Sequence, residues 1–162
     1  MHRTGSERTL EFFTVARRPF YNICVIMPRL IVQPSAEADL DELYEVDEEA
    51  AATINVLLDE IYGNEQLIEL LCRDRVARRE DPAFDNERFI ELWNDGYTIY
   101  RLKMWDFDGA LIPYRVLHAY DGRTDCTHIL AILPREHSYD TAHEKVRRCV
   151  GDYDALGFYR AK

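Results

Sequence analysis

Three short segments rich in β-branched and aromatic residues lie between residues 97 and 140, and they constrain the fold more than any other part of the chain. The segments at 98–105, 112–120 and 126–133 alternate between apolar and polar residues, which is typical of strands with one buried face. Asp-Gly pairs separate them at Asp108 and Asp121. Asp-Gly accepts the positive φ angles of tight hairpin turns, so the sequence predicts three consecutive antiparallel strands.

Basic residues lie on the first two of these predicted strands. Alternation places Arg101, Lys103 and Trp105 on one face of the first strand, and Arg115 opens the second. Guanidinium groups can bind two phosphate oxygens at once, and aromatic rings can stack on nucleobases. We therefore predict a phosphate-binding surface on this face of the sheet. The alternative is that these side chains only cover a solvated strand.

A second polar group follows the third predicted strand. Arg135, His137 and Tyr139 are separated by single residues. Histidine is the side chain that exchanges a proton most readily near neutral pH. Arginine can bind a phosphate, and tyrosine can take part in proton transfer. These three residues predict an acid–base group at the end of the sheet.

The part of the chain before residue 72 has a helical period after one opening strand. Residues 27–32 predict that strand, and we expect Ser35 to cap the helix that follows it. Asp47 precedes a second run with apolar residues at three- and four-residue spacing. Gly63 should end this run, and a short third helix is expected after it. We therefore predict that this part of the chain forms a helical hairpin.

The remaining segments complete the predicted architecture. The mixed charge of segment 73–82 predicts a loop. We expect a helical turn at 85–93 and a final helix at 140–150. The expected class is α+β: a small, mostly antiparallel four-stranded sheet packed against an N-terminal helical hairpin, with a C-terminal helix. We expect a single domain over 27–162, and the sequence leaves the order of the extension at 1–26 open.

Charge and cysteine content narrow the functional class. The net charge is −10, and most of the acidity lies in 34–96, so the strand-rich third is nearly balanced. Overall negative charge should weaken long-range attraction to RNA, although a local basic patch can still bind phosphate. No apolar run approaches the roughly 18 residues of a membrane helix. The four cysteines form no CxxC pair, so we expect free thiols in a cytoplasmic protein. We also expect neither a metal ion nor a cofactor.

Local motifs in this order resemble the RelE/ParE superfamily of toxins from type II toxin–antitoxin systems. YRLK at 100–103 resembles the basic first central strand of the family. PYRVLHAYD at 113–121 resembles its second strand, and ILAILPREHSYD at 129–140 its third strand with a trailing Arg and Tyr. The resemblance covers about residues 27–150. It implies a compact α+β toxin that a small cognate antitoxin neutralises.

The resemblance implies two alternative activities. RelE-like members cleave mRNA on the ribosome without a metal, whereas ParE-like members are not nucleases and inhibit DNA gyrase by binding it. A third possibility is a degenerate member that only binds an antitoxin. We favour the RelE-like endoribonuclease, which needs proton transfer and a stabilised phosphate. The candidate catalytic residues are Arg115, Arg135, His137 and Tyr139, and the candidate RNA-binding residues are Arg101, Lys103 and Trp105.

Overall fold

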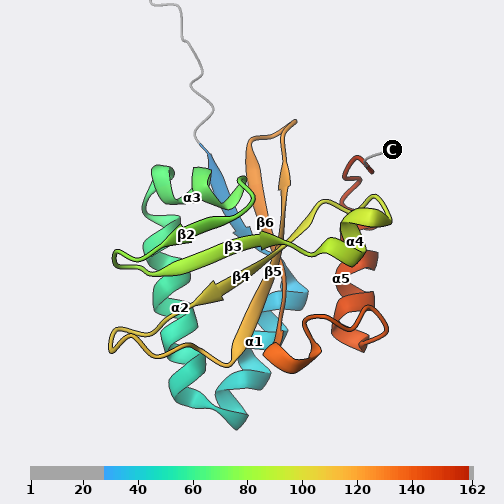
Figure 1. The fold of residues 1–162 in the computed structure, drawn as a ribbon. Helices are drawn as coiled ribbons and strands as arrows, with labels where there is room; N and C mark the ends of the chain where they lie inside the picture. The colour runs from blue at the N-terminus through green and yellow to red at the C-terminus, as the bar shows by residue number, and fades with distance from the viewer. Residues whose placement is uncertain (1–27, 161–162) are drawn as a thin grey trace, which may run out of the picture.

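A six-stranded mixed sheet forms the centre of the protein, and a computed structural model describes it for residues 28–160 (Figure 1). The strand order is β1-β6-β5-β4-β3-β2. β1 pairs with β6 in parallel, and all other neighbours are antiparallel. The strands are β1 Arg29–Val32, β2 Val76–Arg78, β3 Phe84–Arg88, β4 Ile99–Met104, β5 Tyr114–Asp121 and β6 Cys126–Pro134.

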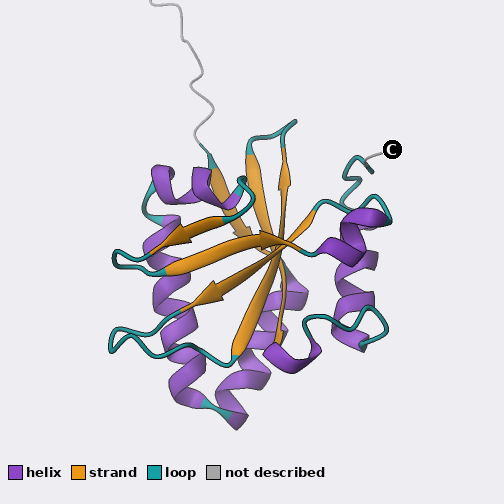
Figure 2. Ribbon diagram, in the orientation of Figure 1, coloured by secondary structure: helices purple, strands orange, loops and turns teal. Residues whose placement is uncertain are grey.

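Helices pack on both faces of this sheet (Figure 2). The helices are α1 Pro34–Val46, α2 Glu48–Tyr62, α3 Glu65–Leu71, α4 Ile90–Asn94 and α5 Glu144–Ala155, with a 3-10 turn η1 at Arg135–His137. α1, α2 and α3 cover one face, where their apolar residues form a core with Leu102, Val116 and Ile132. α4 and α5 cover part of the other face, where a second core includes Leu117 and Tyr153.

The helix boundaries follow from local sequence. The Asp47 side chain accepts a hydrogen bond from the backbone N–H of Ala50, so it caps α2 as the sequence predicted. Asn64 caps α3 in the same way. The prediction of Ser35 as the first cap is wrong, because α1 begins one residue earlier at Pro34. Proline is well suited to a first helical turn, where its missing N–H has no partner to lose.

The sheet has two more strands than the sequence predicted, and it is mixed. The predicted loop at 73–82 contains β2, and the predicted helical turn at 85–93 is β3 followed by the short helix α4. β2 has only three residues, and β3 has the polar sequence FDNER. These strands are stabilised by pairing with each other and with β4, which a local apolar pattern does not reveal. The α+β class itself is confirmed.

Two other expectations depend on the described range. The extension at 1–26 lies outside residues 28–160, as does Cys24, whereas Cys72, Cys126 and Cys149 are free thiols. In residues 28–160, every helix is too short or too polar to cross a membrane.

Candidate functional site

The candidate site lies on the sheet face that α4 and α5 cover only in part. In the orientation of Figure 2, strands β3, β4 and β5 run in front of α1 and α2, with α5 to one side. Cross-strand pairing places Glu87 of β3 opposite Arg101 of β4, and Asp85 opposite Lys103. Residues that pair across antiparallel strands share a face, so two carboxylates and two cations lie together there.

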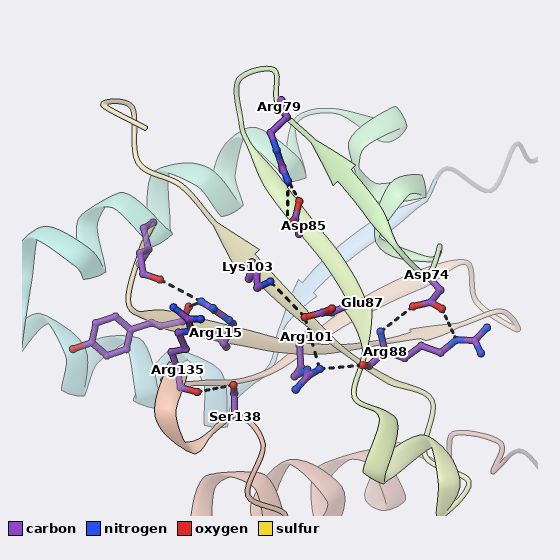
Figure 3. Close-up of polar contacts among 12 residues, drawn as sticks. Asp74, Arg79, Asp85, Glu87, Arg88, Arg101, Lys103, Arg115, Arg135 and Ser138 are labelled. Atoms are coloured by element: carbon purple, nitrogen blue, oxygen red, sulfur yellow. Dashed lines mark hydrogen bonds and ion pairs between the residues drawn. The ribbon is translucent and has the colours of Figure 1, made fainter. Parts of the chain in front are cut away.

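Arg101 is a buried cation, which rules out the alternative that it only covers a solvated strand. It is 6% exposed. One guanidinium nitrogen, Nη2, lies 3.7 Å from the carboxylate of Glu87 and 3.5 Å from the carbonyl oxygen of Arg88 (Figure 3). The Tyr139 ring stacks over the guanidinium carbon at 4.1 Å from the ring centre, and the Phe89 ring lies at 5.2 Å. Aromatic side chains therefore shield Arg101 from solvent.

Arg115 is buried even more completely, at 1% exposure. Its Nη1 donates to the carbonyl oxygens of Tyr114 at 2.8 Å and Ile112 at 3.3 Å. Burial, with the nearby positive charge of Arg135 as a second cause, lowers the pKa of Arg115. Figure 3 shows Arg115 and Arg135 side by side, below Lys103. The alternative that Arg115 only covers a solvated strand is therefore wrong.

Both arginines keep buried donors without a partner. Nε and Nη1 of Arg101 and Nη2 of Arg115 are buried and have no hydrogen-bond partner. Buried polar groups in native proteins are nearly always paired, and buried charges need a counter-ion. Glu87, shared with Lys103 at 3.8 Å, is a weak counter-ion for this many positive charges. If the half-exposed Tyr139 ring moves away from Arg101, an anion can enter and satisfy several of these guanidinium N–H groups at once.

Glu87 is a residue of the candidate site that the sequence analysis did not single out. The segment 85–93 was predicted to be helical, so no cross-strand pairing of Glu87 was expected. In the structure it lies on β3, half-buried between Arg101 and Lys103. The signal that could have found it is the alternation of Asp85 and Glu87 in a short polar strand. A carboxylate that lies close to a bound substrate is a candidate proton acceptor.

Arg135 and Tyr139 border an open depression of about 570 Å³, which Pro113, Tyr114, Pro134 and Glu136 also line. The backbone N–H of Arg135 donates to the carbonyl oxygen of Pro113 at 2.9 Å. The buried Ser138 hydroxyl closes the turn by donating to the Arg135 carbonyl oxygen at 2.8 Å. The Arg135 side chain is exposed, and Tyr139 is 49% exposed. Both side chains are thus accessible to a ligand from solvent.

Two predicted site residues have other contacts. The His137 ring stacks on the ring of His143, the N-cap residue of α5, with 4.4 Å between centroids. Its Nε2 lies 3.4 Å from a carboxylate oxygen of Glu136. Trp105 lies beyond the end of β4, where the guanidinium of Arg79 stacks on it. The structure thus brings Arg101, Lys103, Arg115, Arg135 and Tyr139 together, and places His137 and Trp105 at the margins of this group.

Comparisons with protein-family models, with curated proteins and with solved structures found no match to this chain. Within residues 28–160, no group of three or more His, Cys, Asp and Glu side chains is arranged to hold a metal ion. The fold and site define an α+β protein with a mixed six-stranded sheet and a partly buried arginine cluster on one face.

Proposed function

We propose that this protein is a toxin of the RelE/ParE superfamily, and that it is a RelE-like, metal-independent endoribonuclease that cleaves mRNA on the ribosome. The observation that carries this proposal is the pair of buried arginines with three unpaired guanidinium nitrogens. A phosphodiester offers two free oxygens with delocalised charge, which match the guanidinium geometry. Basic and aromatic groups that surround the arginines extend the surface available to a polynucleotide.

Different residues of the cluster can perform the separate steps of RNA cleavage. The ribose 2′-oxygen attacks the adjacent phosphorus, its proton goes to a base, and the 5′-oxygen leaves with a proton from an acid. The products are a 2′,3′-cyclic phosphate and a 5′-hydroxyl. Arg101 and Arg115 stabilise the charge that accumulates on the phosphate. We assign Glu87 as the proton acceptor, because it lies 3.7 Å from the Arg101 guanidinium.

The proton donor in this scheme comes from η1 and the turn that follows it. Tyr139 is assigned as the donor because its ring covers Arg101 at 4.1 Å and remains half exposed. His137 is the other donor on this turn, although its ring stacks on His143. Arg135 is exposed beside the depression, so it can bind a phosphate that has not yet entered the buried part of the site.

The proposal includes partners and a compartment. A toxin of this kind acts in the cytoplasm on ribosome-bound mRNA. A cognate antitoxin would neutralise it with an amphipathic segment, disordered when free, laid on the basic and aromatic face. Half-exposed Tyr139 and the depression beside it offer apolar area for such a segment.

Induced expression in a bacterial host tests the proposal, with growth and the integrity of an abundant transcript followed together. Arrest with discrete cuts in the mRNA is expected for the parent. Arg101→Met and Arg135→Ala should each relieve arrest and cutting. Arg123→Ala is the matched control, because Arg123 is an exposed arginine paired with Asp121 at the β5–β6 turn, outside the cluster. Equal cutting by the parent and Arg101→Met would refute the assignment of the site.

A ParE-like gyrase inhibitor is the second candidate. It is favoured by the position of His137, whose ring stacks on His143 at the start of α5. His137 is therefore at the margin of the arginine cluster, where fewer acid–base groups remain for catalysis. The net charge of −10 also favours a protein surface over unaided contact with RNA. Arrest with intact mRNA and blocked DNA supercoiling would support this candidate. Absence of arrest would leave a domain that only binds an antitoxin.

A further inference from the structure

A second cationic and aromatic surface lies on the same sheet face, beyond the arginine cluster. We call it the stacking surface and define it by Arg79, Trp105 and Phe107. The Arg79 guanidinium lies over the Trp105 ring at 4.8 Å from the ring centre. Phe107 is 58% exposed. The three side chains line an open cavity of about 390 Å³.

The Arg79 guanidinium is held in place before any ligand arrives. Nη1 and Nη2 both donate to the carboxylate of Asp85, one oxygen each (Figure 3). Asp85 is fixed in turn by its position on β3, opposite Lys103. A guanidinium fixed by a two-pronged ion pair and by an aromatic ring is a planar platform, which loses little entropy when a second planar group stacks on it.

The stacking surface continues the line of the arginine cluster. Arg101 and Lys103 are alternate residues of β4, and Trp105 follows at the same spacing just beyond the strand. Figure 3 shows Arg79, Lys103 and Arg101 following one another across the sheet. Strands rise about 3.3 Å per residue, so Trp105 lies roughly 13 Å from Arg101 along the strand. A single-stranded nucleotide chain bound at Arg101 can therefore place a neighbouring base at Trp105.

We propose that Arg79, Trp105 and Phe107 form a subsite for one nucleobase of single-stranded RNA, and that Lys103 binds the phosphate between this base and the arginine cluster. The inference rests on the proposed function and names a further part of its substrate site. Stacking on aromatic rings and on guanidinium planes is how proteins commonly hold unpaired bases. Every base has a π-face, so the subsite adds affinity with little preference for sequence.

Tryptophan fluorescence of the full chain provides a direct test. The chain has two tryptophans, so Trp93→Phe leaves Trp105 as the sole indole. The probe is a short RNA with a 2′-O-methyl group on every ribose, which cannot be cleaved through the 2′-oxygen. A matched probe lacks the base at one position. We expect the complete probe to quench Trp105 fluorescence, and the best-placed abasic probe to bind about tenfold more weakly.

Variants locate the effect on the protein. Phe107→Ala should weaken binding of the complete probe severalfold and leave binding of the abasic probe unchanged, because Phe107 is exposed and its loss should not disturb the fold. Tyr159→Ala, which removes another exposed aromatic side chain at a distant position, is the control and should alter neither.

The outcomes separate this inference from the proposed function. Trp105 quenching that depends on the base supports the subsite, even if the parent cuts no RNA. Cleavage by the parent, with equal binding of complete and abasic probes, overturns the subsite and leaves the nuclease proposal standing. If no single-stranded probe binds at all, the subsite is overturned, whereas the nuclease proposal is decided separately by the cutting of ribosome-bound mRNA on induced expression.

Discussion

Arg101 combines burial with two guanidinium nitrogens that have no partner. Such a charge costs stability in the absence of a ligand, since its hydration is lost and only partly replaced. We expect Arg101→Met, which keeps the apolar length of the side chain, to raise the melting temperature or leave it unchanged. The same variant should lower cleavage by about 100-fold or more, as for the loss of a charge-stabilising donor.

Thermal unfolding and a cleavage assay on the same preparation would measure this trade-off. Arg123→Met is the control, because Arg123 is half exposed and paired with Asp121. The interpretation of Arg101 as a ligand-binding group would be wrong if its variant lost stability and activity together, since that pattern indicates a structural role.

His118 gives the stability of the fold a specific pH dependence. Burial lowers the pKa of His118 to about 3, whereas an unfolded histidine titrates at about 6.5. Between these two values the unfolded chain binds a proton that the folded chain does not. The free energy of unfolding should therefore fall as pH decreases from about 6.5 toward 3, by up to about 1.4 kcal/mol per pH unit from this group.

Urea unfolding at pH 7 and pH 5 checks this expectation. His118 Nε2 lies 2.7 Å from the side-chain oxygen of Asn86, and glutamine can keep a donor at that place. We expect His118→Gln to lose less stability than the parent between the two pH values. Identical losses would show that other groups carry the pH dependence.

At the scale of elements, Asp39 of α1 joins three parts of the fold. Its carboxylate, 2% exposed, accepts from the Ile132 N–H of β6 at 2.9 Å and pairs with Lys145 and Arg148 of α5. Removal of one partner from a buried ion pair typically costs about 3–5 kcal/mol. We expect Asp39→Ala to lower the free energy of unfolding by this amount, as measured in urea.

A neighbouring acid provides the comparison. Glu42 also pairs with Lys145, at 2.7 Å, but its side chain is largely exposed. Exposed ion pairs contribute about 0–1 kcal/mol, so Glu42→Ala should have a small effect. Similar losses for the two variants would mean that burial does not determine the strength of this junction.

The comparison of predicted and observed elements shows where sequence patterns suffice. β4, β5 and β6 were predicted within about two residues, because apolar alternation and Asp-Gly turns are local signals. β2 and β3 were missed, because their pairing partners rather than their own residues determine them. The candidate arginines were proposed from the sequence, but their burial and the position of Glu87 beside them depend on contacts between strands.

At the scale of the whole molecule, the charge distribution predicts a modest dependence of the proposed RNA binding on salt. The net charge is −10, and the candidate site has cations at Arg101, Lys103 and Arg115 interspersed with Asp85 and Glu87. If two or three phosphates are contacted, log K against log salt should have a slope of about −1.4 to −2.1.

Fluorescence titrations with the uncleavable probe at several salt concentrations give this slope directly. Lys103→Ala should reduce it by about 0.7, since one phosphate contact is lost. A slope several times steeper would indicate a much larger contact surface than the line from Arg101 to Trp105.

The parallel pairing of β1 with β6 has a consequence for biosynthesis. Arg29 pairs with Cys126 and Val32 with Ile129. β1 therefore cannot pair until the ribosome has synthesised β6, nearly a hundred residues later. Strands this far apart in the sequence pair late in folding, because their pairing costs a large loss of chain entropy. On a translating ribosome, the helical hairpin can form early, but the sheet that carries the arginines can be completed only after most of the chain has emerged.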